Sequence, residues 1–131
     1  MKAYSLANKT ALVTGASRGI GRAVAIALGD AGAEVIVNYS NSSEKAEEVV
    51  EKIISSGGSA YPLQADIADE ASVDGLIKAI IQRSGGIDVL VNNAGITSDG
   101  LLMRMKTTEW QKVINLNLTG VFLTTRAVAR T

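Results

Sequence analysis

The chain of 131 residues carries 13 basic and 13 acidic side chains, so its formal net charge is zero. This length suits one domain with a sizeable core, and the balanced charge argues against attraction to nucleic acid or to a membrane surface. The sequence has no cysteine and no histidine, which excludes disulfides and a Cys-rich metal site and removes the commonest general base.

The N-terminal segment, residues 1–6, is too short and too polar for a signal peptide. No apolar run is long enough to cross a bilayer, so we expect a soluble, cytoplasmic protein. With neither histidine nor cysteine available, we expect no bound metal.

The first predicted strand, Thr10–Val13, is apolar and leads into a glycine-rich turn that opens a helix over about 18–31. Gly15 suits the tight turn, Gly19 lets a phosphate approach the backbone, and Gly21 lets the helix pack closely on the strand. The free amides of the first helical turn then face an anion. An ordinary structural turn is the alternative. The candidate nucleotide-binding residues of this turn are Gly15, Ser17, Arg18, Gly19, Ile20 and Gly21.

The second predicted strand covers 34–38 and leads into four neutral residues, Asn38, Tyr39, Ser40 and Asn41. An acidic residue at this point would bind the ribose 2′-hydroxyl of NAD and repel a 2′-phosphate. The neutral side chains, together with Arg18, favour NADP(H), because arginine pairs with phosphate in a bidentate way. A solvated loop charge is the alternative interpretation of Arg18.

The second and third helices show one apolar stripe each. Asn41 is expected to cap the second helix, with Glu44 three residues later as in a capping box. Pairs of glycines end both helices, and the strand between them, 59–65, contains Pro62, which cannot donate to a ladder and therefore predicts an edge strand. The residues expected to be buried are Ala46, Val49, Val50, Ile53 and Ile54 in the second helix and Val73, Leu76, Ile77, Ile80 and Ile81 in the third.

Polar residues follow the third and fourth predicted strands. The carboxylate of Asp66 can accept a hydrogen bond from an adenine amino group; capping of the third helix is its alternative role and the preferred role of Asp69. The fourth strand, 87–92, leads into Asn-Asn-Ala-Gly, whose amides can tie neighbouring loops together and whose small residues leave room for a ribose or nicotinamide. The candidate cofactor contacts here are Asp66, Ile67, Asn92, Ala94 and Gly95.

Strands and helices alternate along the chain, and apolar strands with right-handed crossovers predict a parallel sheet covered on both faces. The expected fold class is α/β, a Rossmann-type doubly wound sheet of order 3-2-1-4 that forms one NAD(P)-binding domain over 1–131. The ligand is then expected beyond the carboxyl ends of the strands, at the switch between strands one and four. The sequence stops at Thr131, inside or just after the fourth helix, so we expect a sheet truncated after that helix.

The fourth helix is expected to begin near Thr107 or Thr108 and to carry Trp110 on its apolar face. Asn117 lies seven residues after Trp110 on the same stripe, and a buried amide there must be paired. One interpretation of Asn117 is purely structural, with its side chain hydrogen-bonded to the backbone of a neighbouring loop. Asn115 lies off the stripe and is the weaker candidate.

Four segments together resemble the short-chain dehydrogenase/reductase family. They are 14–21, with its Thr-Gly-x-x-x-Gly-x-Gly spacing, then Asp66, then 92–95, and finally 115–120 with Asn-Leu-Asn-Leu-Thr-Gly. Within the family, residues 95–106 are similar to the 3-oxoacyl-(acyl-carrier-protein) reductases. The resemblance covers the chain from about Lys9 to its end.

This resemblance implies an NADPH-dependent reduction of a 3-oxoacyl group carried on acyl carrier protein, in fatty-acid synthesis, by a homo-oligomer. It also implies a catalytic role for Asn117, since the matching asparagine of the family holds a water in the proton relay. The family's general acid is a tyrosine with a lysine four residues later, assisted by a serine on a fifth strand. Here the residues four positions after Tyr4, Tyr39 and Tyr61 are Asn8, Ser43 and Ala65.

We therefore expect these 131 residues to bind cofactor without catalysing the reduction. Three alternatives stay open. The chain can be a minimal nucleotide-binding or folding module without catalysis, an interaction protein that associates through the edge of strand four, or part of a short-chain reductase for another substrate.

Overall fold

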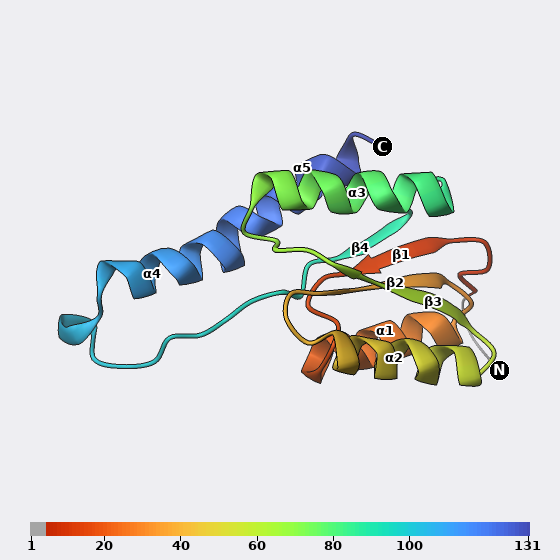
Figure 1. Cartoon of the computed structure of the whole chain (residues 1–131), viewed down its shortest axis with the longest axis horizontal. Helices are drawn as coiled ribbons and strands as arrows, with labels where there is room; N and C mark the ends of the chain where they lie inside the picture. The colour runs from red at the N-terminus through yellow and green to blue at the C-terminus, as the bar shows by residue number, and fades with distance from the viewer. Residues whose placement is uncertain (1–4) are drawn as a thin grey trace.

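The strands form a parallel sheet of the predicted order β3-β2-β1-β4 in the computed structural model, which describes residues 5–131 (Figure 1). Residues 1–4, which belong to the segment judged too polar for a signal peptide and include Tyr4, lie outside the described residues. The strands are β1 (Thr10–Val13), β2 (Glu34–Tyr39), β3 (Ser59–Gln64) and β4 (Val89–Val91).

Helices cover both faces of the sheet. The helices on one face are α1 (Gly19–Asp30) and α2 (Ser43–Ser55), and those on the other are α3 (Glu70–Ser84) and α5 (Gly120–Ala129) (Figure 1). Between β4 and α5 the chain forms a short 3-10 helix, η1 (Leu102–Arg104), the helix α4 (Thr107–Ile114) and a π-helical turn, η2 (Asn115–Thr119).

Alternate residues of the central strand β1 face the two helical layers. Ala11 and Val13 belong to the core with α1 and α2, whereas Leu12 belongs to the core with α3, where it is buried together with Ile80. Because both faces of β1 are covered, the strand has no polar alternation and its sequence is a continuous apolar run.

Several local predictions are confirmed. Pro62 lies in β3, which is an edge strand of the sheet. The carboxylate of Asp69 caps α3 by accepting the Ser72 backbone N–H at 2.9 Å. Gly85 ends the same helix with a φ of 87°, a left-handed conformation that glycine adopts without a steric penalty.

The predicted cap of the second helix is wrong. Helix α2 begins at Ser43 with Ser42 at the N-cap position, and in the described part of the chain no side-chain hydrogen bond caps it. The side-chain amide of Gln64 donates to the Ser40 carbonyl at 3.1 Å. This contact ties the segment before the helix to β3.

The predicted apolar stripes and the fourth strand are also too long. Ile54 is 53% exposed and Ile81 is 37% exposed, because each lies at the border of its helical stripe, where the helix turns toward solvent. The paired strand β4 covers Val89–Val91 only. Asp88 still contacts β1, since its backbone N–H donates to the Thr10 carbonyl at 2.8 Å.

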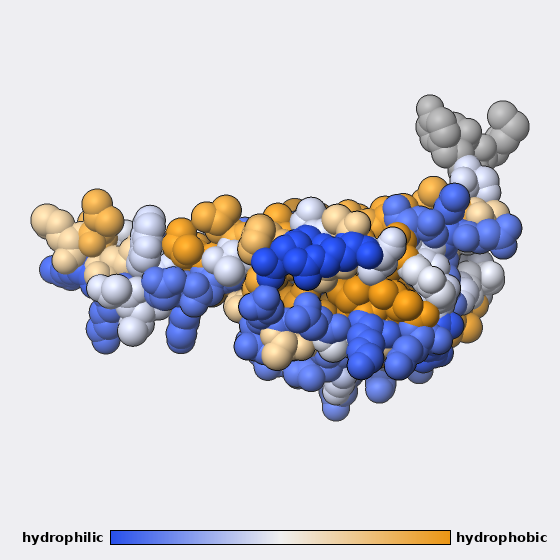
Figure 2. Space-filling model, turned by 90° about the horizontal axis from the view of Figure 1, so that it is seen from above, coloured by the Kyte–Doolittle hydropathy of each residue, from blue (hydrophilic) through white to orange (hydrophobic). Residues whose placement is uncertain are grey.

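The segment from α4 to α5 is one continuous helical stretch whose first part projects away from the sheet (Figure 1). The prediction that Trp110 and Asn117 share a buried stripe is wrong, since Trp110 is 55% exposed and Asn117 is exposed too. The π-helical turn adds a residue to one turn and so shifts the later positions, and no sheet lies beneath α4. Figure 2 shows apolar side chains along this projecting segment. The large exposed apolar residues between β4 and the end of α5 are Ile96, Leu101, Leu102, Met103, Trp110, Leu118 and Phe122.

A hydrogen-bonded chain joins β2, β3 and the end of α3. The Tyr61 hydroxyl lies 2.7 Å from Ser84 Oγ, which donates in turn to the Glu34 carboxylate, and the Arg83 guanidinium stacks 3.8 Å from the centroid of the Tyr61 ring. Burial raises the pKa of Tyr61 above its ordinary value, and it outweighs the opposing effect of the Ser84 hydrogen bond.

The free energy of unfolding is therefore expected to fall as the pH rises above about 10, the ordinary tyrosine pKa. The neutral phenol is favoured more strongly in the folded chain than in the unfolded one. The stabilising contribution of the neutral Tyr61 phenol is complete below the tyrosine pKa of the unfolded chain. It is lost as the pH rises through the raised pKa of Tyr61 in the folded chain. Urea unfolding across this alkaline range should show a shallower pH slope for Tyr61→Phe than for the wild type, and an unchanged slope would contradict the prediction.

Candidate functional site

A cavity of about 460 Å³ lies at the carboxyl ends of the strands, between the glycine turn, the end of β2 and the loops after β3 and β4. This is the switch point between β1 and β4 at which the sequence predicts a ligand. The predicted site residues that line it are Gly15, Ser17, Arg18, Gly19, Ile20, Asn38, Tyr39, Ser40, Asp66, Ile67, Ala94 and Gly95. The predicted residues Gly21 and Asn92 lie outside its lining.

The glycine turn leaves backbone open to the cavity. Gly15 and Gly19 both have a φ of 60°, a left-handed conformation. A Cβ on Gly15 would lie 2.9 Å from Ala94 Cα, whereas nothing lies within 4 Å of a Cβ on Gly19. Helix α1 starts here with Arg18 at the N-cap position, and no side chain of residues 5–131 caps it. The amides of its first turn are therefore available to an anion.

Arg18 supplies the positive charge of the site. Its side chain is exposed and lines the cavity, and it forms no ion pair with any residue in the range 5–131. A guanidinium in this position is free to bind a phosphate in a bidentate way. The neutral residues of the β2 end that line the cavity with it are Asn38, Tyr39, Ser40, Asn41 and Ser42.

Asn38 has a role beneath the cavity wall. Its side chain is 1% exposed, its Oδ1 accepts the Gly15 N–H at 3.1 Å, and its Nδ2 donates to the Leu63 carbonyl at 3.3 Å. The buried amide thus joins the glycine turn after β1 to the end of β3. The side chains after Asn38, rather than its own amide, are left to face a ligand.

A second set of hydrogen bonds joins the glycine turn to the loop after β4. The buried Thr14 hydroxyl accepts the backbone N–H groups of Asn93 and Ala94 at 2.9 and 3.0 Å. The Asn93 side chain donates to the carbonyls of Thr14 and Gly15 at 3.2 and 3.0 Å. The prediction that this pair of asparagines ties loops together is confirmed for Asn93, whereas Asn92 ties the same loop to helix α5 by donating to the Thr125 hydroxyl at 3.1 Å.

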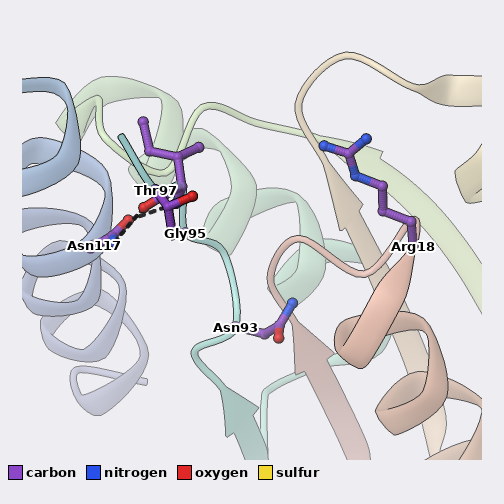
Figure 3. A pocket seen from close by; sticks show the side chains of 6 residues that line it. Arg18, Asn93, Gly95, Thr97 and Asn117 are labelled. Atoms are coloured by element: carbon purple, nitrogen blue, oxygen red, sulfur yellow. Dashed lines mark hydrogen bonds between the residues drawn. The ribbon is translucent and has the colours of Figure 1, made fainter. Parts of the chain in front are cut away.

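Asn117 lies against a neighbouring, more open cavity of about 580 Å³ that Arg18 and Asn93 also line (Figure 3). Its Oδ1 accepts the Ile96 N–H and its Nδ2 donates to the Ile96 carbonyl, both at 2.8 Å. Both the oxygen and the nitrogen of the exposed amide are thus bonded to the loop after β4. In Figure 3 this pairing holds Gly95 and Thr97 beside the helical segment.

Some lining residues were not predicted. Asn93 is visible in the sequence as part of the Asn-Asn pair. Its contacts with Thr14 and Gly15, which lie almost 80 positions earlier in the chain, depend on the fold. Ile96 and Thr97 directly follow the predicted Gly95, so a longer motif would have included them. Leu116 lines the cavity from the π-helical turn, for which the sequence offers no signal.

Within residues 5–131, no three His, Cys, Asp or Glu side chains come together in a way that could hold a metal ion. Within the same range, every helix is too short or too polar to cross a membrane.

Comparison with known proteins agrees with this geometry. A 3-oxoacyl-(acyl-carrier-protein) reductase of Synechocystis is 56% identical over 126 residues, which are 96% of this chain and 51% of that protein. A Staphylococcus aureus protein of the same name is 56% identical over 114 residues, 87% of this chain and 46% of that protein. The chain thus spans about half the length of the curated relatives that it matches.

Solved structures show the same fold. A short-chain dehydrogenase/reductase from Mycobacterium marinum has a TM-score of 0.92 at 41% identity, over 96% of this chain and 51% of that one. A Burkholderia cenocepacia short-chain dehydrogenase in complex with NADP has a TM-score of 0.91 at 41% identity, over 95% of this chain and 51% of that one. A family model described as short chain dehydrogenase matches residues 9–131. The chain therefore belongs to the short-chain dehydrogenase family.

Proposed function

We propose that the chain binds NADP(H) in the cavity at the carboxyl end of the sheet. In this proposal it forms the cofactor-binding portion of a reductase that acts on 3-oxoacyl groups carried by acyl carrier protein. The observation that carries the cofactor assignment is Arg18, without an ion-pair partner among residues 5–131, beside a helix N-terminus that no side chain of that range caps and a neutral β2 end. The names of the 56% identical relatives support the substrate class.

For each part of the cofactor, the cavity has lining residues of suitable chemistry. The backbone of Gly19 and Ile20 can receive the pyrophosphate, Arg18 and Ser40 the 2′-phosphate, and Asp66 with Ile67 the adenine. Ala94 and Gly95 are small lining residues that would leave room for the nicotinamide end. NADPH supplies a hydride to a carbonyl carbon when it is bound.

Asn117 is the residue of this chain that we assign to the catalytic machinery. Its paired amide holds the Ile96 backbone at the border between the two cavities. The 131 residues contain no Tyr-x-x-x-Lys, so we propose that this polypeptide by itself binds cofactor and does not reduce the substrate. A binding module without catalysis remains the alternative, and restored turnover on adding the other half of a relative would decide against it.

We further propose that the protein assembles into oligomers or associates through β4. In the described part of the chain, β4 is an edge strand of the sheet, and its three residues are only partly buried. An apolar edge strand presents backbone groups that another strand can pair with.

Titration with NADPH and NADH, followed by cofactor fluorescence and light scattering together, tests these proposals. The wild type should bind NADPH more tightly than NADH. Arg18→Ala should weaken NADPH binding by about tenfold and change NADH binding little, because one charge-assisted contact is lost. Arg22→Ala, which removes an exposed arginine outside the cavity lining, is the matched control and should leave both affinities unchanged. A folded, dispersed wild type that binds neither nucleotide would overturn the cofactor assignment.

A further inference from the structure

We propose that Ser72 is a positioning residue for base recognition: its hydroxyl holds Asp66 in the orientation that selects the adenine 6-amino group. The inference rests on the proposed binding of NADP(H). Ser72 itself is outside the cavity lining, whereas Asp66 and Ile67 line it. Ser72 therefore acts on a bound base through the loop after β3, and Asp66 is the lining residue that its hydroxyl bonds.

Ser72 closes a ring of hydrogen bonds between the loop after β3 and the first turn of α3. The Asp66 N–H donates to Ser72 Oγ at 2.8 Å, the Ser72 N–H donates to Asp69 Oδ2 at 2.9 Å, and the Asp69 N–H donates to the Asp66 carbonyl at 3.1 Å. The loop cannot rotate without breaking one of these bonds. The next residue, Val73, is fully buried and anchors the ring to the core.

The same loop leaves one carboxylate oxygen open. Asp66 Oδ1 accepts the Ala68 N–H at 3.0 Å, and Oδ2 has no hydrogen-bond partner among the residues that the structure describes. Asp66 is exposed toward the cavity that it lines. Its Oδ2 is thus the acceptor available to the amino group of an adenine.

The residues on either side of Asp66 are held independently of Ser72. The Ala65 N–H donates to the Tyr39 carbonyl at 3.0 Å. Ile67 is 4% exposed, and α5 packs so closely on it that a Cβ on Gly120 would lie 2.9 Å from Ile67 Cγ2. The peptide between Ala65 and Asp66 is left between these two anchors, and the Ser72 hydroxyl determines its orientation.

The test compares NADPH with its hypoxanthine analogue, in which a carbonyl replaces the adenine 6-amino group. The wild type is expected to bind NADPH about tenfold more tightly than the analogue, as suits one hydrogen bond to a carboxylate. Ser72→Ala should reduce this preference to about threefold or less, since the donor of Asp66 loses its partner and the loop can rotate. Asp66→Ala should abolish the preference, and so give the largest loss of preference that Ser72→Ala could cause.

Three variants complete the design. Ser72→Thr retains the hydroxyl and should retain the preference. Ser55→Ala removes an exposed serine hydroxyl that, among residues 5–131, bonds only the Lys52 carbonyl on α2, and it should behave as the wild type. Asp69→Ala opens the ring at its second bond and should also lower the preference, so the proposal stays testable even if Ser72→Ala does not fold.

A purely structural role would lower the melting temperature or weaken both nucleotides equally. An unchanged ratio of the two affinities in Ser72→Ala, or in Asp69→Ala where the former does not fold, would overturn the inference. Wild-type binding without any preference for adenine would also overturn it while leaving the proposed function intact. Absence of all nucleotide binding would overturn both.

Discussion

Gly21→Ala is expected to lower the free energy of unfolding by about 3 kcal/mol, the upper range for overpacking a tightly fitted site. A Cβ on Gly21 would lie 2.3 Å from Asn93 Nδ2 and 2.5 Å from the Gly15 carbonyl oxygen. Neither neighbour can yield at low cost. The Asn93 amide is held by the carbonyls of Thr14 and Gly15, and the Gly15 oxygen belongs to the turn backbone. The glycine turn and the loop after β4 must therefore separate.

The matched control is Gly75→Ala. Gly75 lies within α3, and nothing lies within 4 Å of a Cβ built on it. Alanine is the better helix former, so this variant should gain about 0.5–1 kcal/mol. Urea unfolding of both variants measures the contrast, and a Gly21→Ala protein as stable as the wild type would show that the turn and the loop after β4 are not packed as described. The same separation should weaken NADPH binding, because the displaced residues line the cavity.

The features that the sequence predicts correctly depend on local patterns. Continuous apolar runs identify buried parallel strands, and Pro62 identifies the edge strand through chemistry that needs no tertiary information. The glycine turn is predictable for the same reason. Gly15 and Gly19 adopt the left-handed conformation that glycine favours, and this preference needs no tertiary contact. With right-handed crossovers, these elements place the cavity at the switch point.

The features that the sequence does not predict depend on partners far along the chain. Asn117 has the spacing of a buried helical stripe, but the π-helical turn and the projection of α4 leave it exposed and paired with Ile96. Asn41 has the sequence context of a helix cap, but α2 begins at Ser43 with Ser42 at the N-cap position. The local sequence is compatible with Asn117 on a buried stripe and with Asn41 as a helix cap. Only the three-dimensional structure shows that neither arrangement forms.

Asn38 is a further example, because an asparagine at a strand end looks the same whether it faces a ligand or lies beneath a loop. In the structure its orientation is set by its neighbours. The Gly15 N–H requires an acceptor on one side, and on the other side the carbonyls of Leu63, Tyr39 and Ala65 lie 3.3, 3.5 and 3.5 Å from Nδ2 and require a donor. Exchanging the donor for an acceptor should therefore be costly.

Asn38→Asp is expected to destabilise the protein by about 3 kcal/mol at neutral pH, because it places a buried carboxylate oxygen against carbonyl oxygens. Burial and these oxygens should raise the pKa of the introduced carboxyl, since the protonated form can still donate. The favourable contribution of the protonated carboxyl at position 38 is complete below about pH 4, its pKa in the unfolded chain. It is lost as the pH rises through its pKa in the folded chain.

The gap in unfolding free energy between Asn38→Asp and the wild type should therefore widen from acidic to neutral pH and then level off. Urea unfolding at a series of pH values measures it. Asn41→Asp makes the same chemical change at an exposed position three residues later, and its gap should stay within about 0.5 kcal/mol throughout. A penalty in Asn38→Asp that does not change with pH would mean that the loss comes from packing alone. In that case the donor function of the Asn38 amide would not be what joins the glycine turn to the end of β3.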